Sequence, residues 1–389
     1  MQTYTINFPK RVISGLGSIN LIYDILKENK VKNVSILTDR GVFETGIVDK
    51  ILDTLRDFNI NIIKDVPPEP EKNQVIKIYN ELKNFNSDLI IAIGGGSVID
   101  TTKIVASLLK NEEYLSDILN SKLITRKGVP FISVPTSAGT GAEVTPNAIV
   151  LVPEKKLKVG IVSTCFISDY VILDPDMTLK LPPSITAATG LDAFCHAIEC
   201  FISKKANPFS DLYALKAIEL ITQNIKAAYD NGKNVEARGN MLLAAFYGGL
   251  AIASASTVAV HALSYPLGGT YRIPHGVSNA MLLPYVMEYN ADAILDKLVK
   301  IAIVMGIDVS GKTEKEISEE VILEIFDLVK YLGIPSDLSK YGVDYPNLDS
   351  LVNSAFEVKR LLDNNPKVMS KEDIRNIYLK LMNTSTVNN

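Results

Sequence analysis

The first half of the chain alternates short runs of Val, Ile and Leu with segments whose apolar residues recur at helical spacing. The short runs predict β-strands at Asn33–Thr38, Ile60–Ile63, Asp88–Ile93, Phe131–Pro135 and Asn147–Val152. The periodic segments predict helices at Ile47–Arg56, Asn73–Phe85 and Ser97–Leu109. Buried strands that alternate with helices are typical of a parallel sheet with helices on both faces.

The second half has few extended apolar runs and long helical patterns instead. Pro182 and Pro183 mark the change, and the helices expected after them are Ala187–Ile202, Phe209–Ala228 and Glu314–Leu332. The pattern therefore predicts two domains, an α/β domain with a parallel, Rossmann-like sheet over residues 1–183 and an all-α domain over residues 184–389.

Composition narrows the class of protein. The 389 residues include 40 Lys and Arg against 44 Asp and Glu, so no basic surplus exists for nucleic-acid binding. With 47% hydrophobic and 22% charged residues, the chain reads as an ordinary globular protein. The three cysteines form no CxxC pair, which favours a reduced, cytoplasmic setting.

One segment, Met241–Tyr271, contains no Asp, Glu, Lys or Arg and is long enough to span a bilayer. Small and hydroxyl residues dilute its hydrophobicity, and His261 lies inside it. We interpret it as a buried helix of the helical domain. The N-terminal residues also lack the apolar core of a signal peptide, so no membrane partner is expected.

A glycine loop follows the strand at Asp88–Ile93, in the sequence IAIGGGSVIDTTK. Gly94, Gly95 and Gly96 lead into a helix that Ser97 is expected to open, with Asp100 in its first turn. Glycines allow close approach of a ligand, and a helix N-terminus favours a phosphate. The alternative is a plain strand-to-helix turn with Ser97 as N-cap.

Two further features suit a nucleotide. The loop after Phe131–Pro135 offers hydroxyls at Thr136, Ser137 and Thr140, at a strand end where open parallel sheets bind ligands, although it could be a hydrophilic connection. Asp39 ends the strand Asn33–Thr38, where a carboxylate can accept a ribose 2′-hydroxyl and favour NAD over NADP. It could equally be a solvated aspartate that caps the next helix.

The three histidines of the chain define a candidate metal site with one aspartate. Asp192 and His196 are spaced i and i+4, so they project from one face of a helix. His261 and His275 are separated by a Pro- and Gly-containing segment that can turn back toward one centre. One carboxylate with three neutral imidazoles suits a divalent ion such as Fe²⁺ or Zn²⁺, acting as a Lewis acid. Each histidine alone could be an ordinary core residue.

Together these motifs resemble the group III, iron-containing alcohol dehydrogenases. Four segments carry the resemblance, which spans almost the whole chain: GGGSVIDTTK, PTSAGTGAEVT, TGLDAFCHAIE and HALSYPLGGTYRIPHGVSNAMLLP. The resemblance is specific for the family and not for the substrate.

The resemblance implies a dehydroquinate synthase-like fold, with a dinucleotide-binding N-terminal domain and a helical, metal-binding catalytic domain. It implies Fe²⁺, with Zn²⁺ as an alternative, held by Asp192, His196, His261 and His275. It implies NAD(H), with NADP(H) as a variant, held by residues that include Asp39, Gly95, Gly96, Ser97, Asp100, Thr136, Ser137, Thr140 and Lys158. A homodimer acting on a small alcohol or aldehyde is the corresponding expectation.

Tyr265 departs from the family pattern. Many members have a histidine at this place, four residues after the third metal ligand, whereas a tyrosine with a pKa of about 10 is a poor base at neutral pH. Proton relay through ribose hydroxyls and water is the remaining hypothesis.

Three rivals stay open. A glycerol dehydrogenase-like zinc enzyme would share the fold. An NADPH-dependent aldehyde reductase would share the site and is a variant of the main interpretation, not one of the three rivals. A dehydroquinate synthase-like lyase would need Lys and Arg at the metal centre, which the helical motifs do not offer. From a different class, the chain could be a non-catalytic nucleotide-binding sensor.

Overall fold

The computed structural model describes residues 3–68, 70–152 and 157–382. Contacts divide the chain into two units, each described here by itself. One unit comprises Asn7–Leu181 together with Gly232–Gly249, and the other comprises the rest of the described chain. The segment Gly232–Gly249 therefore belongs with the α/β unit, although it lies in the helical half of the sequence.

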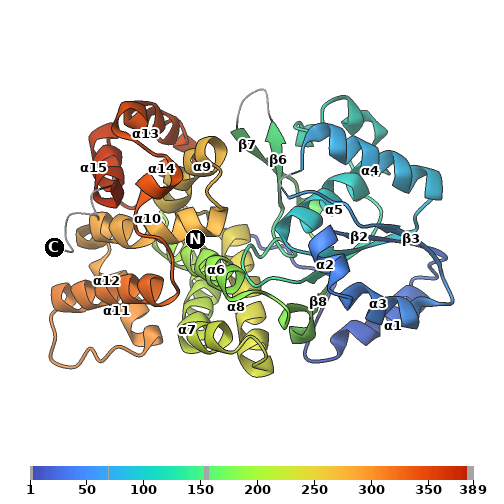
Figure 1. Ribbon diagram of the computed structural model, residues 1–389, viewed down its shortest axis with the longest axis horizontal. Helices are drawn as coiled ribbons and strands as arrows, with labels where there is room; N and C mark the ends of the chain where they lie inside the picture. Colours follow the sequence, from blue (N-terminus) through green and yellow to red (C-terminus); the bar gives the residue numbers. More distant parts are fainter. Residues whose placement is uncertain (1–2, 69, 153–156, 383–389) are drawn as a thin grey trace. The chain divides into compact units, whose positions relative to one another are not determined.

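The α/β unit is built on a six-stranded sheet with the order β1-β8-β5-β4-β2-β3, in which every strand pair is parallel (Figure 1). Its strands are β1 (Arg11–Ser14), β2 (Asn33–Thr38), β3 (Asn59–Ile63), β4 (Leu89–Gly94), β5 (Phe131–Pro135) and β8 (Tyr170–Leu173). Its principal helices are α1 (Ile22–Glu28), α2 (Arg40–Glu44), α3 (Ile47–Leu52), α4 (Lys72–Phe85) and α5 (Gly96–Leu108). The predicted parallel sheet is confirmed.

Both faces of the central part of this sheet are buried, because successive residues of its central strands enter opposite clusters. In β2, Leu37 packs with α4 and α5, whereas Ile36 packs with α1 and α3. The central strand β4 is buried at every position. This explains why the strands read as continuous apolar runs rather than as alternating ones.

One strand was assigned wrongly. The strand at Asn147–Val152 exists as β6, but it lies outside the parallel sheet and pairs antiparallel with β7 (Leu157–Val162) as a separate hairpin. Its β-branched, apolar sequence predicts a strand without fixing the partner, and β7 lies close enough along the chain to pair first.

The second unit is helical. Its elements are α6 (Pro183–Ile202), α7 (Pro208–Asp230), α9 (Ala259–Tyr271), α10 (His275–Asn290), α11 (Leu295–Met305), α12 (Glu314–Tyr331), α13 (Leu348–Phe356), α14 (Lys359–Leu362), α15 (Lys371–Met382) and the end of α8 (Val235–Ser254). The predicted helical second half is confirmed, and α6 packs against α7 and α10.

Among the described residues, α6 is long and apolar enough to cross a bilayer, with mean hydropathy 1.3 over the tested window. However, 83% of that window is buried inside the protein, as in a core helix of a soluble protein. The uncharged segment Met241–Tyr271 runs through α8 and α9, which bend by 105° at the break between them. Its helices therefore carry buried side chains, as the sequence predicts.

Candidate metal centre and nucleotide-binding loops

Helix α6 supplies the first two residues of the candidate metal centre. Asp192 and His196 lie one turn apart, with His196 Nε2 3.9 Å from Asp192 Oδ1. The helix starts after Pro182 with Pro183 in its first turn, where proline is tolerated because no intrahelical N–H is required. Its interior is apolar apart from these two residues, a few hydroxyls and Glu199, so the polar groups project from a buried surface.

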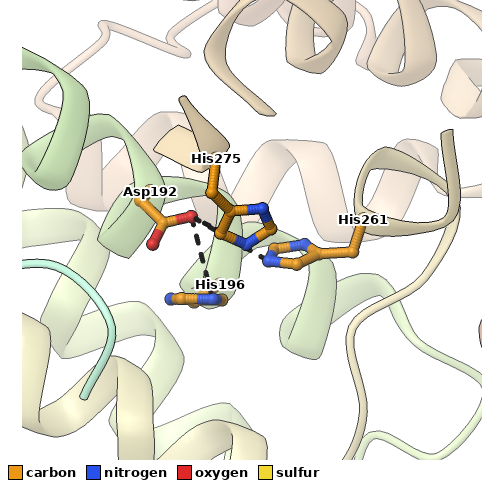
Figure 2. Close-up of side chains that lie close together, drawn as sticks. All are labelled: Asp192, His196, His261 and His275. Carbon is orange, nitrogen blue, oxygen red and sulfur yellow. Dashed lines mark ion pairs between the residues drawn. The ribbon is translucent and has the colours of Figure 1, made fainter. Parts of the chain in front are cut away.

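Helices α9 and α10 bring the other two histidines to the same point (Figure 2). The Nε2 atoms of His261 and His275 lie 4.0 Å and 3.7 Å from Asp192 Oδ1. The rings of His196 and His261 stack with centroids 4.7 Å apart. The convergence expected from the sequence is therefore present in the structure.

The four side chains fit a metal ion. One ligand atom from each of the four lies within 4.8 Å of all the others. Two ligands on opposite sides of an ion, each at about 2.1 Å, would be about 4.2 Å apart. Small rotations of the side chains would therefore bring all four ligand atoms into contact with one ion. One carboxylate oxygen and three imidazole nitrogens form a donor set that suits a divalent first-row metal.

His275 forms the open side of the cluster, because it is the most exposed of the four side chains. The side chains of Asp192, His196 and His261 are 5%, 8% and 4% exposed, whereas that of His275 is 33% exposed. Burial alone would raise the pKa of Asp192, but the neighbouring imidazoles and the Asn279 amide outweigh it and hold this pKa below its ordinary value. The carboxylate is thus kept ionised, as a metal ligand must be.

Glu199 is a functional candidate that the sequence analysis missed. It is fully buried, and its Oε1 accepts hydrogen bonds from the backbone N–H groups of Val258, Val260 and His261 at 3.0, 2.8 and 3.3 Å. Its Oε2 contacts His261 Nδ1. The sequence did offer a signal for Glu199, because it lies seven residues after Asp192 and is the only other charged residue of α6.

Asn279 is the second missed residue. Its Nδ2 donates to Asp192 Oδ1 at 2.7 Å and lies 3.1 Å from His261 Nε2 and 3.2 Å from His275 Nε2. Its Oδ1 is buried and has no hydrogen-bond partner among the described residues. The sequence signal was an amide four residues after His275, directly before the apolar run Ala280–Pro284. The amide holds the ligand oxygen of Asp192 toward the two imidazoles.

Tyr265 lies against the open side of the cluster. Its ring centroid is 6.1 Å from that of His275 and 6.5 Å from that of His261. Burial raises the pKa of Tyr265, and the nearby Arg360 only partly offsets this effect. The phenol is therefore protonated at neutral pH and can donate a hydrogen bond.

Replacement of Glu199 by glutamine is expected to weaken metal binding, on the order of 10- to 100-fold, although the side chain keeps its size. If the amide oxygen keeps the backbone hydrogen bonds of Oε1, the amide NH₂ faces His261 Nδ1. His261 Nδ1 must then accept a hydrogen bond from this amide, so the imidazole proton moves to Nε2. A protonated Nε2, the atom that faces the other ligands, cannot bind a metal ion. Competition with a chelator measures the affinity. Glu288→Gln, which removes an exposed partner of Lys380, is the matched control, and equal affinity in both variants would contradict the prediction.

The two predicted cofactor loops lie side by side in the α/β unit. They follow the adjacent strands β4 and β5, and Thr136 N donates to Gly94 O at 3.2 Å. A Cβ atom added to Gly96 would lie 2.9 Å from Thr140 Cγ2, so the glycine is required by this close approach. Asp39 follows β2, the neighbour of β4, and between these two strands the chain reverses its direction across the sheet. Open parallel sheets bind ligands at such a position.

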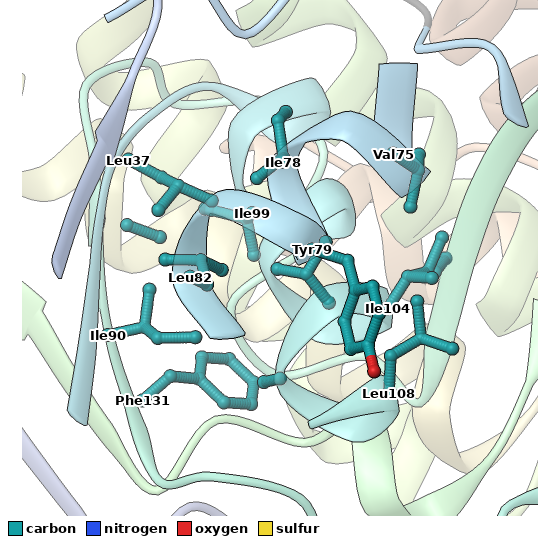
Figure 3. Packing of buried hydrophobic residues seen from close by; sticks show 14 of the residues in the cluster. Leu37, Val75, Ile78, Tyr79, Leu82, Ile90, Ile99, Ile104, Leu108 and Phe131 are labelled. Carbon is teal, nitrogen blue, oxygen red and sulfur yellow. The ribbon is translucent and has the colours of Figure 1, made fainter. Parts of the chain in front are cut away.

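Helix α5 is held firmly beneath the glycine loop. Its residues Ile99, Ile104 and Leu108 belong to the apolar cluster that also contains Tyr79 and Phe131 (Figure 3). This packing fixes the N-terminus of α5, whose first-turn N–H groups have no partners within the helix. A backbone fixed in this way can hold a phosphate without reorganising.

Two local expectations for this loop were wrong. The helix begins at Gly96 with Gly95 as N-cap, so Ser97 does not cap it, and Asp100 lies beyond the first turn. Asp100 accepts hydrogen bonds from Lys103 Nζ at 2.9 Å and from Ile149 N at 3.1 Å. Both of its carboxylate oxygens therefore bind the protein itself, and they join α5 to β6.

Asp39 caps a helix, as the alternative interpretation held. Its Oδ1 accepts a hydrogen bond from Val42 N at 2.9 Å at the start of α2, which begins at Arg40. Its part in NAD preference stays a prediction. Lys158 lies in β7, but its side chain is outside the described residues.

Glu143, in the second cofactor loop, should make stability depend on pH. It is 2% exposed, and burial raises its pKa to about 7, with smaller opposing effects that include the charge of Lys103. Because the folded-state pKa lies above the unfolded value of about 4.3, stability falls as pH rises through this window, by about 4 kcal/mol in total.

Glu143→Gln removes this ionisation, so the variant should unfold at a higher temperature than the wild type at pH 8.5 and at a similar one at pH 4.5. Thermal unfolding across the pH range measures the difference. The exposed Glu81→Gln is the control, and a wild-type stability that rises between pH 5 and 8 relative to Glu143→Gln would refute the argument.

Comparisons with known proteins agree with this architecture. Residues 9–175 match the profile of the iron-containing alcohol dehydrogenases, and residues 186–382 match that of the Fe-containing alcohol dehydrogenase family, C-terminal. The chain therefore belongs to the iron-containing alcohol dehydrogenase family, which confirms the resemblance seen in its motifs. It is an oxidoreductase of the alcohol dehydrogenase and aldehyde reductase class.

Among its relatives, long-chain-alcohol dehydrogenase 1 of Geobacillus thermodenitrificans is 36% identical, over 97% of this chain and 96% of the relative. The NAD-dependent methanol dehydrogenase of Bacillus methanolicus is 30% identical, over 95% of this chain and 97% of the relative. A solved structure of 1,3-propanediol oxidoreductase aligns with a TM-score of 0.94 at 32% identity, covering 98% of this chain and all of the other.

Proposed function

We propose that the protein is a metal-dependent, NAD(H)-linked alcohol dehydrogenase that interconverts a primary alcohol or diol and its aldehyde by hydride transfer. The observation that carries this proposal is the convergence of Asp192, His196, His261 and His275. The α/β unit would bind the dinucleotide, and the helical unit would hold the metal. A relative named as an NAD-dependent methanol dehydrogenase and structural likeness to 1,3-propanediol oxidoreductase support the cofactor and the substrate class.

A divalent ion at the four side chains would supply Lewis acidity toward the substrate oxygen, with Fe²⁺ as the expected metal and Zn²⁺ as the alternative. Asp192 supplies the one negative charge of the ligand set, and Asn279 orients it. Glu199 keeps the proton of His261 on Nδ1, so that Nε2 faces the other ligands. The burial of three of the four ligands limits water to the His275 side.

For the dinucleotide, the backbone of Gly95 and Gly96 with Ser97 would bind the pyrophosphate, and Thr136, Ser137 and Thr140 would bind the neighbouring groups. The close approach of Gly96 to Thr140 supports a joint binding surface. Asp39 would favour NAD(H) over NADP(H). The homodimer and the cytoplasmic location stay predictions.

Tyr265→Phe is expected to keep substantial activity, with kcat reduced by less than about tenfold. The raised pKa of Tyr265 makes its phenol a poor proton acceptor, so a proton route through ribose hydroxyls and water remains open without it. The pH profile of kcat compared between wild type and variant tests this. Near-total loss of turnover, with metal content and fold intact, would mean that Tyr265 is essential to the reaction.

The proposed function is tested anaerobically. The protein is stripped of metal, reloaded with Fe²⁺ or Zn²⁺ and followed by NADH absorbance with a panel of short and branched aldehydes. NADPH and metal-free protein run alongside. Metal-dependent loss of NADH supports the proposal. A preference for NADPH selects the NADPH-dependent aldehyde reductase, and a preference for Zn²⁺ with glycerol selects the glycerol dehydrogenase-like enzyme. Absence of any turnover despite stoichiometric metal overturns the proposal in favour of a sensor or a non-redox reaction.

A further inference from the structure

A substrate can approach the candidate metal centre on the side of His275. His275 is the exposed member of the cluster, and the other three members are almost fully buried. Tyr265 lies on this side, half-buried, with its ring close to both His275 and His261. A substrate bound on this side would therefore extend past the side chains around Tyr265.

Arg360 is placed next to Tyr265 by helix α14, which packs against α9. Asn364 Nδ2 donates to Arg360 O at 2.8 Å and to Ser256 Oγ at 3.2 Å, which ties α14 to the turn that precedes α9. The guanidinium lies close enough to Tyr265 and His261 that its positive charge acts to lower the pKa of both groups. Arg360 is itself exposed and so is accessible to a ligand.

Arg360 differs from other exposed arginines in its ion pairing among the described residues. Arg11 and Arg40 pair with Glu28 and Asp65, whereas within the described ranges no acidic side chain lies within ion-pair distance of Arg360. Tyr265 offers a single neutral acceptor to a group that carries five N–H donors in a planar fork.

The charges around the metal centre lead to the same conclusion. A divalent ion would be neutralised by the two carboxylates that surround the site, Asp192 and Glu199. Arg360 would then leave one surplus positive charge on the open side. A neutral alcohol would not complement this charge, whereas a carboxylate, sulfonate or phosphonate could accept two hydrogen bonds from the fork.

We propose that Arg360 is a specificity-determining residue that binds an anionic group on the substrate. The preferred substrate is then a short aldehyde or alcohol with a carboxylate, sulfonate or phosphonate at the end remote from the reacting carbon. This inference rests on the proposed function for its reaction, while the anion site rests on Arg360 and Tyr265 themselves.

The test compares substrates of matched length with and without the charge: succinic semialdehyde against butanal, and sulfoacetaldehyde against propanal. The wild type should prefer the anionic member of each pair. Arg360→Gln should lower kcat/KM for the anionic members by about tenfold to hundredfold, mainly through KM, and change the neutral members by less than about threefold. Whichever pair shows the larger effect identifies carboxylate or sulfonate as the preferred group.

Lys359→Gln is the matched control, because it removes the same charge from the adjacent residue of α14, where the ammonium lies over the Phe356 ring. It should leave the selectivity unchanged. Arg360→Lys keeps the charge without the fork and should fall between the wild type and Arg360→Gln. Equal losses on charged and neutral substrates, or a wild type without preference, would overturn the inference and leave the proposed function standing.

Binding of 4-hydroxybutyrate and of 1-butanol, measured by calorimetry on the metal-free protein, provides a readout independent of turnover. Binding of 4-hydroxybutyrate that Arg360→Gln abolishes and Lys359→Gln preserves supports the anion site even if no substrate is turned over, in which case only the proposed reaction fails. Binding that is indifferent to Arg360, together with absent turnover, overturns both.

Discussion

Replacement of His261 by alanine is expected to abolish metal retention and to lower kcat/KM by on the order of 10³-fold or more, while NADH binding stays measurable. His261 is buried between Glu199 on one ring nitrogen and the other candidate ligands on the second nitrogen. Loss of His261 leaves three metal ligands and removes the partner of Glu199. The dinucleotide loops lie in the other unit, so their binding should survive.

Metal content after dialysis, turnover of an aldehyde and quenching of NADH fluorescence are measured on the same preparations. Because His261→Ala leaves the buried Glu199 with an unsatisfied oxygen, its fold could weaken by roughly 1–3 kcal/mol. His275→Ala is therefore included, since His275 is more exposed and its replacement disturbs less packing. Thr270→Ala, exposed on the same helix as His261, is the control. Turnover that persists in both histidine variants would remove the metal from the proposed reaction.

The sequence could predict the ligand cluster because its spacing is local and its donors are few. Asp192 and His196 are fixed by one turn of one helix, and only two other histidines exist to complete the set. The parallel sheet was equally predictable, since β4 is apolar throughout and β2 carries Val34, Ile36 and Leu37. In each case the information lies within a short stretch of chain.

Contacts between distant segments were not predictable in the same way. β1 and β8 are four residues long, too short to stand out. β1 is recognisable only by its pairing with β8, and β8 by its pairing with β1 and β5. β6 has the composition of a sheet strand, but its partner β7 follows it directly in the chain. The pairing of strands is decided by tertiary neighbours, so strand propensity alone does not predict it.

The residues that support the site were hard to predict for the same reason, because their roles depend on contacts between helices. Glu199 contacts the first turn of α9, and Arg360 reaches Tyr265 from α14, so neither role is visible before the helices are packed. Glu199 nevertheless had a signal, because a charged residue in an apolar helix has to find a partner. Arg360 had none, since an arginine beside Lys359 reads as solvated surface.

Gly276→Ala is expected to destabilise the protein by roughly 1–3 kcal/mol and to remove its metal site, although helix propensity alone would predict stabilisation by up to about 1 kcal/mol. A Cβ atom at this position would lie 2.1 Å from Ala188 O and 3.3 Å from Asp192 Cβ. The carbonyl belongs to the backbone of α6, so it cannot rotate away. The start of α10 must move away from α6 instead.

That movement would act directly on the ligands, because Gly276 follows His275 in α10 and its added methyl group would press on the segment of α6 that carries Asp192. His275 would be displaced from the other three donors, and chelator competition should record the lower affinity. Gly160→Ala is the control, since its Cβ would meet only the Ile149 methyl group at an ordinary 3.4 Å. Helix propensity and packing predict opposite changes in the stability of Gly276→Ala. A variant that unfolds at a higher temperature and retains its metal would show that α10 tolerates the shift. The metal site would then not depend on this close approach between the helices.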